Sequence, residues 1–477
     1  MKKTIRIAAA AALFFVLLIV GAVSASADSS SPKYIKIGLQ KGAATATVKS
    51  DSGLTLCKAG NNTVTPSSSG ALNGQTTVAL VLSGGKVYVR SGSSSGKILA
   101  TLNGDGTECV VSAGYFSSGD YVTVDGKSYR GSVMPYINSS GRMNVLNYVE
   151  MDDYIRGNLH QEMSQSSNLE ALKTQAIAAR SYAESLRNYH KSQGCDLCNL
   201  SSSWSCGQCQ SYLGVSGEYP KTDQAVRETA GRMMYYQGKV ITAFYFANSG
   251  GHTENCEDAF VAAYGYLRGV RDDYAPDNSW SRTFTRSQLS SLFPSVGTVT
   301  SVSVDRYNES GYAASLTVRG SKGSVTKTKE GIRSAFSLKS RNFTFSTSGG
   351  KLSNVQRPST QLQDNTLYCA LSSAGQRLLG NTLSVISADG VSEVKLNGLK
   401  ILDGSRYITT ASLEEEPANA LLSSTVTLSS NSDTLTINGK GWGHGVGLSQ
   451  ASAIEMGKQG FTCDQILHHF YTDVEIR

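Results

Sequence analysis

The sequence contains little of what marks several common protein classes. Only 8 of its 477 residues are proline and only 17% are charged, so a collagen-like chain and a charged coiled coil are excluded. The 44 basic and 37 acidic residues leave a net charge of +7, too mild a balance to indicate nucleic-acid binding. No HExxH or Walker A motif is present, which argues against the enzyme classes that carry them. The 40% of hydrophobic residues and the 48 glycines favour a turn-rich globular protein.

The first 27 residues have the pattern of an export signal. Lys2, Lys3 and Arg6 precede an uncharged apolar run over 7–23, and a small-residue cleavage site lies at 25–27. The run is just long enough to span a bilayer, so 1–27 is either a signal peptide or an N-terminal membrane anchor. No other run is comparably long and apolar. We therefore expect an exported protein of the cell envelope, secreted or anchored, which touches the membrane only through this segment.

The rest of the chain predicts an α+β fold. Short β-type runs separated by Gly, Ser, Asp and Asn indicate strands in the N-terminal part. Apolar residues at helical spacing predict helices from about residue 152, over 168–190 and over 222–231, and an apolar strand over 240–246. Ser167 and Glu170 fit a capping box for the second helix. The expected organisation is a β-rich N-terminal region at 33–130, a mixed helix-and-sheet domain with a groove at 131–349 and 431–477, and a β-rich insertion at 350–430.

Nine cysteines are present, and four of them lie within fifteen residues. Cys195 and Cys198 form one CxxC pair, Cys206 and Cys209 form a second, and His190 precedes both. Such pairs supply thiolates that are able to surround one tetrahedral zinc ion. In an exported loop the alternatives are two disulfides, or one disulfide beside a metal held by the other residues. The spacing leaves these alternatives open.

Three further features are candidates for chemistry. Glu162 ends an apolar helical face, where a carboxyl half-surrounded by apolar atoms has a raised pKa and is able to donate a proton. The segment 246–254 places Gly250 and Gly251 beside hydroxyl side chains, so that backbone amides can approach a ligand. The glycine-rich segment 439–450 does not fit a nucleotide-binding loop, and we expect it to pack against a site wall. Each feature alone is also compatible with a purely structural role.

Together these residues resemble the family of stage II sporulation protein D and the LytB amidase enhancer. The resemblance rests on five blocks in one order, VLNYVEMDDYIRG at 145–157, QEM at 161–163, LKTQAIAARSYA at 172–183, SGGHTEN at 249–255 and GWGHGVGLSQ at 441–450. The residues 331–333 and 338–340 also look like the family's β segment. The resemblance implies a lytic transglycosylase that cleaves peptidoglycan glycan strands between MurNAc and GlcNAc, in sporulation or cell-wall remodelling. It also implies strands already stripped of their stem peptides and products with 1,6-anhydro ends.

The resemblance also implies roles for individual residues. Glu162 falls on the family's catalytic glutamate. The zinc ligands map best to His190, Cys198 and Cys209, with Cys195 and Cys206 as additional candidates because the loop is longer than usual, and the zinc would be structural. The residues expected around the sugar are Lys173, Gln175, Arg180, Tyr182, Ser249, Gly250, Gly251, His444, Ser449 and Gln450. The expected partners are glycan strands and a cell-wall amidase. The alternative function is a non-catalytic wall-binding enhancer of an N-acetylmuramoyl-L-alanine amidase.

Overall fold

The structure is a computed structural model that describes most of the chain after residue 33. The described residues are 34–477 without 61, 73, 116–119, 200–203, 205, 357–366, 372–374, 380–381, 388–389, 396–399, 404–405 and 410–420. Helices and sheets both contribute to one compact unit that begins at Pro32, so the predicted α+β class is confirmed. The expected signal peptide or anchor at 1–27 lies outside the described residues. Among those residues, no helix is long and apolar enough to cross a membrane.

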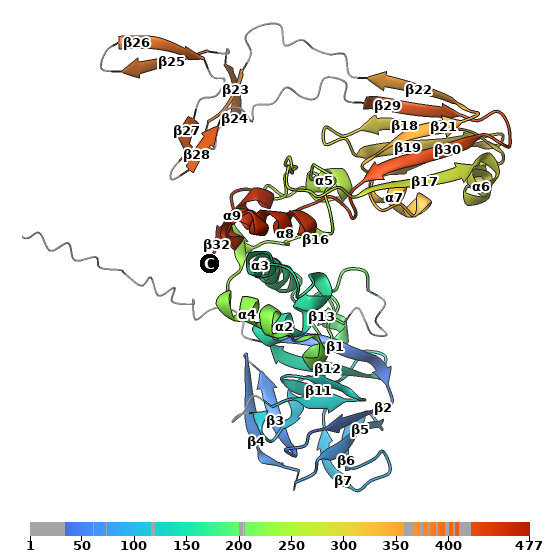
Figure 1. The fold of residues 1–477 in the computed structure, drawn as a ribbon. Coiled ribbons are helices and arrows are strands. Elements are labelled where there is room, and N and C mark those ends of the chain that lie inside the picture. Colours follow the sequence, from blue (N-terminus) through green and yellow to red (C-terminus); the bar gives the residue numbers. More distant parts are fainter. Residues whose placement is uncertain are drawn as a thin grey trace, which may run out of the picture. The chain divides into compact units, whose positions relative to one another are not determined.

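The first sheet joins the N-terminal strands to the strands that precede the helices (Figure 1). Its order is β13 (Leu197–Cys198), β1 (Tyr34–Ala43), β12 (Met143–Glu150), β11 (Ser132–Ile137), β8 (Glu108–Ser112), β3 (Leu54–Gly60) and β4 (Thr63–Ala71). Strand β1 pairs antiparallel with β12 and parallel with β13. The expected boundary at residue 130, between the N-terminal region and the domain that follows it, therefore lies within a single sheet.

A second N-terminal sheet is built from local hairpins. Its order is β10 (Lys127–Tyr129), β9 (Val122–Val124), β2 (Thr45–Lys49), β5 (Thr77–Ser83), β6 (Lys86–Ser91) and β7 (Ile98–Leu102). Asp125 and Gly126 connect β9 to β10, both with positive φ, as a tight two-residue hairpin requires. In β2 and β6, buried aliphatic residues alternate with more exposed residues of other types, the pattern of strands with one face in a core.

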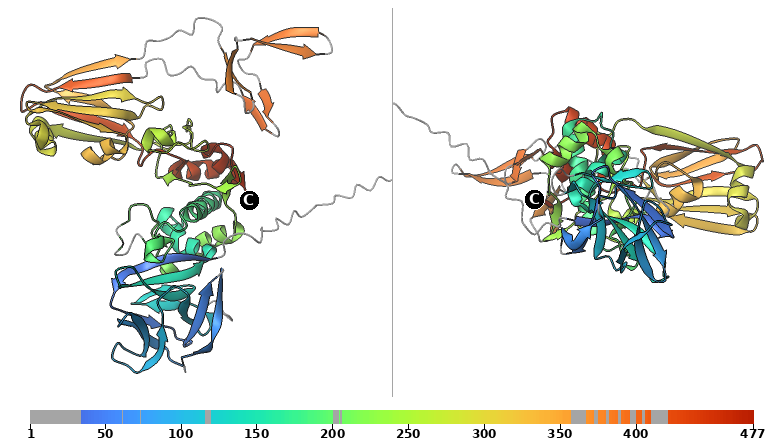
Figure 2. Two further views of the ribbon diagram at one scale, coloured as in Figure 1. Left: turned by 180° about the vertical axis from the view of Figure 1, so that it is seen from behind. Right: turned by 90° about the horizontal axis from the view of Figure 1, so that it is seen from below.

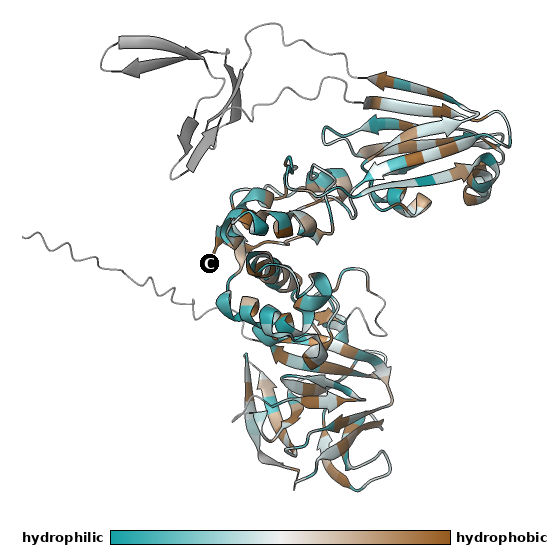
Figure 3. Cartoon of the chain, in the orientation of Figure 1, coloured by the Kyte–Doolittle hydropathy of each residue, from teal (hydrophilic) through white to brown (hydrophobic). Residues whose placement is uncertain are grey.

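Helix α2 packs next to strands β1 and β12 of the first sheet. The helices of this part of the chain are α2 (Met151–Glu162), α3 (Leu169–Ser185), α4 (Pro220–Glu228), α5 (Cys256–Ala259), α8 (Gln450–Lys458) and α9 (Cys463–Phe470), with 3-10 turns at Lys191–Gln193 and Gly214–Gly217. Helix α3 contacts α2, α4, α8 and α9, and Figure 3 shows it as a largely hydrophobic helix. Residues 171, 172 and 174–183 of α3 are all buried. The C-terminal helices and the N-terminal strands thus share one hydrophobic core.

Short strands fix the segments on either side of these helices. They form two small sheets, β15 (Lys239–Val240) with β14 (Met234–Tyr236) and β32 (Glu475–Ile476), and β16 (Tyr245–Phe246) with β31 (Leu448–Ser449). The pairing of β16 with β31 is parallel. It therefore holds the segment after Val240 beside the glycine-rich segment near the C-terminus.

Two further sheets enclose a second core (Figure 2). One has the order β17 (Ser279–Thr285), β30 (Thr434–Lys440) and β21 (Phe343–Ser348), and the other β20 (Gly323–Thr328), β19 (Ala313–Gly320), β18 (Val299–Tyr307), β29 (Leu421–Thr427) and β22 (Lys351–Gln356). Helices α6 (Arg286–Leu292) and α7 (Glu330–Phe336) and a 3-10 turn at Pro294–Val296 complete this region. The buried side chains of Glu254 and Arg341 form an ion pair that joins the segment after β16 to this second core.

The predicted insertion at 350–430 begins and ends with strands of the second core, β22 and β29. Between them the structure describes three separate hairpins, β23 (Leu367–Leu371) with β24 (Gly375–Leu379), β25 (Thr382–Ser387) with β26 (Gly390–Lys395), and β27 (Lys400–Asp403) with β28 (Arg406–Thr409). This part of the chain is β-rich, as expected.

Three local predictions need correction. The cap of α3 is Asn168, whose side chain accepts a hydrogen bond from the Ala171 amide at 2.9 Å, so the predicted Ser167 capping box is wrong. Helix α3 ends at Ser185 rather than near residue 190. The predicted strand at 240–246 is instead two short strands, of which β15 pairs with the adjacent β14 and β16 with the distant β31, because an apolar run does not reveal its pairing partners.

Candidate functional site

Glu162 is the last residue of helix α2. The helix buries Tyr154, Ile155 and Leu159 completely, and the Met163 amide donates to the Leu159 carbonyl at 2.9 Å, where the chain leaves the helix. This packing holds the partly buried Glu162 side chain at the end of an apolar helix face. The prediction that Glu162 ends such a face is therefore confirmed.

The surroundings of the Glu162 carboxyl raise its pKa. Burial is the main cause, because it disfavours the charged form. Hydrogen bonds from the Asn158 amide, 3.5 Å from Oε1, and from the Tyr245 hydroxyl oppose this effect. The balance favours a carboxyl that keeps its proton at a higher pH than an exposed glutamate and still has donors for the ionised form.

A chain of hydrogen bonds orients the Tyr245 hydroxyl. The Tyr154 hydroxyl donates to Gln210 Oε1 at 3.0 Å, and Gln210 Nε2 donates to the Tyr245 hydroxyl oxygen at 2.9 Å. Because that oxygen is already an acceptor, its own proton is available for Glu162. Gln210 directly follows the cysteine loop, so the loop and the carboxyl are connected through two side chains.

The first residue of helix α8 contacts the end of helix α2. Gln450 Nε2 donates to the Glu162 carbonyl at 2.9 Å and to Gln175 Oε1 at 3.3 Å. Gln175 has no exposed surface, and its Nε2 has no partner among the described residues. A buried amide without an acceptor is unusual, so Gln175 has a free donor near Gln450.

His444 lies on the other side of Tyr245, in the glycine-rich segment. Its Nδ1 accepts from the Val446 amide at 3.1 Å, so Nε2 carries the proton and donates to the Tyr245 carbonyl at 3.1 Å. Burial lowers the pKa of His444 to about 4, which keeps the ring neutral near neutral pH. The packing of this ring therefore positions the backbone of Tyr245.

Four side chains of the cysteine loop converge on one point. The ligand atoms of His190, Cys198, Cys206 and Cys209 all lie within 4.8 Å of one another. The Cys209 sulfur is 3.5 Å from that of Cys206 and 3.6 Å from His190 Nε2. Three sulfurs and one imidazole nitrogen at these separations suit a tetrahedral zinc ion.

Cys195 is the expected candidate that this cluster does not include. The backbone at 196 and 199 pairs with strand β1, so this segment is extended and its side chains alternate between two faces. Cys195 and Cys198 are an odd number of residues apart and point to opposite sides. Cys195 instead lines a separate hollow of about 480 Å³ with Tyr136 and Lys36. Burial raises the pKa of its thiol to about 12.

All eight cysteines whose side chains the structure describes are free thiols. The ninth, Cys369, lies where side chains are not described. Within the described part of the chain the loop therefore holds a four-residue ligand cluster and no disulfide.

The residues expected around the sugar do not all gather at Glu162. Arg180 is fully buried and pairs with Asp152 at 2.7 Å, so a sugar contact for Arg180 is replaced by a packing role. Lys173 pairs with Glu170 and Glu228. The Tyr182 hydroxyl donates to the Gln208 carbonyl at 2.7 Å, within the cysteine loop.

The serine and glycine candidates form a second buried group. The Ser249 hydroxyl donates to Asp272 at 2.6 Å, as does that of Ser452, which also contacts Ser449 at 2.7 Å. Ser249 and Ser449 have no exposed surface, so in this structure their hydroxyls bond within the fold. Gly250 and Gly251 follow, partly and largely exposed.

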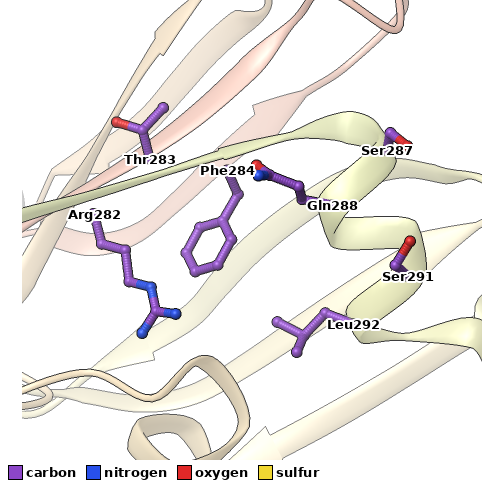
Figure 4. Close-up of a pocket in the computed structure, with 7 residues that line it drawn as sticks. All are labelled: Arg282, Thr283, Phe284, Ser287, Gln288, Ser291 and Leu292. Atoms are coloured by element: carbon purple, nitrogen blue, oxygen red, sulfur yellow. The ribbon is translucent and has the colours of Figure 1, made fainter.

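The structure also contains a hollow on the second core. It has a volume of about 470 Å³ and is lined by residues of β17 and α6, including Arg282, Phe284 and Leu292 (Figure 4). No residue expected at the site lines it. Neither this hollow nor the one at Cys195 includes Glu162.

Sequence reasoning missed the three side chains closest to the chemistry of Glu162. Asn158 precedes it by one helical turn, a spacing that places both on one helix face and was a usable signal. Gln210 and Tyr245 have no such signal, because only the fold brings them to the carboxyl.

Comparison with known proteins finds similarity to members of one family. Residues 139–236 match the family model for SpoIID, described as stage II sporulation protein. The amidase enhancer of Bacillus subtilis (strain 168) is 25% identical over 386 residues, 79% of this chain and 48% of that protein. An uncharacterized protein of Brachyspira hyodysenteriae is 35% identical over 178 residues, 36% of this chain and 46% of that protein. Stage II sporulation protein D of Bacillus subtilis is 24% identical over 340 residues, 69% of this chain and 74% of that protein. The chain thus spans about half the length of the first two of these relatives.

Proposed function

We propose that this chain, which contains a SpoIID domain and is related to the stage II sporulation protein D and amidase-enhancer proteins, is an exported lytic transglycosylase of peptidoglycan glycan strands. The observation that carries the proposal is the Glu162 carboxyl, whose pKa is raised by burial beside the Tyr245 hydroxyl and the Asn158 amide. A carboxyl of this kind is suited to general acid catalysis near neutral pH. The names of the relatives support a role at the cell envelope.

One carboxyl is sufficient for the proposed reaction. Glu162 donates its proton to the glycosidic oxygen while the bond from that oxygen to C1 of the muramyl sugar breaks. The resulting carboxylate then takes the proton of the muramyl C6 hydroxyl as its oxygen bonds to C1 and closes the 1,6-anhydro ring. The nucleophile belongs to the same sugar and is already positioned, so a second carboxylate is not required.

Tyr245 and Gln210 serve as positioning residues in this proposal. The ionised carboxylate formed after the first proton transfer is stabilised by donors that are already in place. Tyr245 supplies one of them, and Gln210 holds the Tyr245 oxygen at 2.9 Å. The free Nε2 of Gln175 is a third donor close to the same helix end.

The cysteine loop is proposed to hold zinc through His190, Cys198, Cys206 and Cys209. Four protein ligands close the coordination sphere, as is typical of a structural zinc. The metal would supply a cross-link within the loop. Gln210 follows Cys209 directly, so a metal that orders the loop would also fix Gln210. Gln210 in turn positions Tyr245 and, through Tyr245, the Glu162 carboxyl.

Digestion of defined glycan strands tests the enzymatic proposal. Peptide-free strands are incubated with the exported chain, and the products are analysed by mass spectrometry. We expect 1,6-anhydro ends from the wild type, none from Glu162→Gln and normal amounts from Glu455→Gln, which removes a carboxylate from helix α8. Absence of anhydro ends from the wild type would overturn the proposal.

A second candidate is a non-catalytic enhancer of a cell-wall amidase. It is favoured by the B. subtilis relative named amidase enhancer, whose similarity covers 79% of this chain. The measurement is release of peptides from purified walls by an N-acetylmuramoyl-L-alanine amidase with and without this protein. Enhancement that is equal for the wild type and Glu162→Gln supports the second candidate. Enhancement lost with Glu162→Gln supports the enzyme.

A further inference from the structure

The hollow of about 480 Å³ beside Cys195, here called the Cys195 hollow, has no role in the proposed chemistry of Glu162. One side is lined by residues of β1, β12 and β11, which are neighbours in the first sheet (Figure 1). The other lining residues lie at the turn between β3 and β4 and in the connection from helix α3 to strand β13. Ligand pockets commonly have volumes of about 300–1,000 Å³. The hollow is therefore large enough for a small ligand or for one repeat of a polymer.

The alternation of strand β1 determines which side chains face this hollow. Tyr34 and Lys36 are two residues apart and lie on one face of the strand. Ile35 and Ile37 lie on the opposite face and have no exposed surface. Lys36 is directly opposite Tyr148 in the antiparallel pairing with β12, and the Tyr34 ring stacks on the Tyr148 ring with centroids 4.8 Å apart. The face toward the hollow therefore combines aromatic rings with an ammonium group.

Asp196 is the acidic residue that lines the Cys195 hollow, and its charge is compensated within the fold. Arg187 lies 3.4 Å from the Asp196 carboxylate and also pairs with Glu184 at 2.6 Å. The Asp196 carboxylate accepts from the backbone amides of Lys36 at 2.9 Å and Asn188 at 3.0 Å. The carboxylate and the guanidinium are thus occupied with each other and with the backbone.

The two lysine side chains of the Cys195 hollow have no such compensation. The half-buried Lys36 ammonium donates to the Gly106 carbonyl at 3.3 Å and lies 5.8 Å from the Tyr148 ring centroid. It keeps further N–H donors after this contact. Lys191 is exposed. Among the residues that the structure describes, neither ammonium has a carboxylate partner, in contrast to that of Lys173. The hollow is therefore positively charged.

Donor side chains line the Cys195 hollow from separate segments of the chain. Lys36 lies on the sheet, Asn62 lies on the turn between β3 and β4, and Asn188 and Lys191 lie in the connection after helix α3. A phosphate group presents its oxygens tetrahedrally, whereas the two oxygens of a carboxylate lie in one plane. Lysine is also a common phosphate ligand because its ammonium acts as a point charge. Donors on several sides therefore favour a phosphate group over a carboxylate.

We propose that the Cys195 hollow binds a phosphodiester group of an anionic envelope polymer. The phosphate contacts the Lys36 and Lys191 ammonium groups, and the sugar or polyol unit that it joins packs against the tyrosine rings. Because Glu162 does not line this hollow, the polymer holds the protein at the envelope and leaves the acid free. This inference goes beyond the proposed function and does not depend on glycan cleavage.

A phospholipid headgroup carries the same phosphodiester chemistry, but the hollow is better suited to a polymer. Membrane-surface sites place exposed apolar or aromatic side chains among the acyl chains next to the cations. None of the residues that line the Cys195 hollow is an exposed large hydrophobic residue. The polymer is therefore the proposed occupant, and a membrane is an outcome that the experiment tests.

Calorimetric binding to the full exported chain tests the site. The probes are a glycerol phosphate oligomer joined by phosphodiesters, an oligoglutamate of equal charge, and vesicles of phosphatidylglycerol. Lys36→Gln and Lys191→Gln are compared with Lys239→Gln and Lys322→Gln, which remove exposed lysines that do not line the hollow. Lys36→Arg keeps the charge and separates its loss from a disturbed fold.

We expect Lys36→Gln to weaken binding of the glycerol phosphate oligomer about tenfold, because a half-buried hydrogen bond to a charged group is lost. We expect Lys191→Gln to weaken it about two- to fivefold, as for an exposed ion pair. Lys36→Arg should bind more tightly than Lys36→Gln. The two control variants and Glu162→Gln should bind like the wild type, and the oligoglutamate should bind more weakly than the phosphate oligomer.

Three results would overturn the proposal. Equal weakening by all four lysine-to-glutamine variants would show a general attraction of charge and no site. Oligoglutamate bound as tightly as the phosphate oligomer would remove the preference for phosphate. Vesicle binding that depends on Lys36, without binding of the oligomer, would make a membrane the occupant. Failure of the proposed function is a separate result, because it is absence of anhydro ends from the wild type.

Discussion

Removing the Arg341 guanidinium should destabilise the protein strongly, because it would leave a buried carboxylate without its counter-charge. Glu254 and Arg341 both have no exposed surface. Apart from Arg341, the Glu254 carboxylate accepts from Asn308 at 2.9 Å and Ser310 at 2.7 Å. These neutral donors do not neutralise it. Breaking a buried pair by removing one partner costs about 3–5 kcal/mol.

Thermal unfolding of Arg341→Met measures this cost. At an unfolding entropy of about 2.1 cal/mol/K per residue, the expected loss of about 3–5 kcal/mol lowers the Tm of the unit Pro32–Arg477 by roughly 3–6 °C. The control is Lys458→Met, which breaks the exposed pair with Glu455 and should cost at most about 1 kcal/mol. The double variant Glu254→Leu with Arg341→Met should be more stable than Arg341→Met alone, because it leaves no unpaired charge in the core. Equal Tm values for Arg341→Met and Lys458→Met, or a double variant less stable than either single variant, would refute the reasoning.

Three further predictions concern the acid, a helix cap and the cysteine loop. Burial raises the pKa of Glu162, so ionisation of this carboxyl destabilises the fold as pH rises past the ordinary glutamate pKa. The Tm of Glu162→Gln should therefore exceed that of the wild type at pH 8 and equal it at pH 4. A Tm difference that does not change with pH would contradict this. Asn168→Ala should lower stability by about 1 kcal/mol, measured by denaturant unfolding, whereas Ser167→Ala should cost clearly less because Ser167 is not the cap; the reverse order would show that the cap is misassigned. Cys206→Ser should lose zinc, measured by elemental analysis of the purified protein, whereas Cys195→Ser should retain it; equal zinc in both variants would remove Cys206 from the ligand set.

The features that the sequence predicted best are those that depend on residues close to one another along the chain. Helices α2 and α3 follow from apolar residues at helical spacing, and the hairpin at Asp125 and Gly126 from the turn residues themselves. The cap of α3 shows the limit. Ser167 and Asn168 are both good caps, and the choice falls on Asn168, whose amide also donates to the Ile454 carbonyl at 2.7 Å. That partner is 286 residues away, and no local pattern contains it.

The candidate site shows the same contrast between local patterns, which the sequence reveals, and contacts between distant residues, which it does not. The spacing of the cysteines indicated the loop, but the choice of Cys206 over Cys195 depends on pairing with strand β1, 160 residues earlier in the sequence. Tyr245 and Gln210 reach Glu162 only through the parallel pairing of β16 with β31 and the path of the cysteine loop. Long-range pairing of this kind is set by the whole fold, so the carboxyl and its donor Asn158 were predictable, and Tyr245 and Gln210 were not.

The pairing of β22 with β29 has a consequence for how the sequence between them is able to change. The strands are antiparallel neighbours, with Asn354 opposite Ser424 and Leu352 opposite Val426, so the chain departs from and rejoins the sheet at one edge. The entropy of closing a connection grows only slowly with its length. Exchanging residues 357–420 for a short turn, or for an unrelated domain with adjacent ends, should leave both cores and the Glu162 region intact. The protein therefore has a natural position at which new binding modules are acquired or lost without rebuilding the rest.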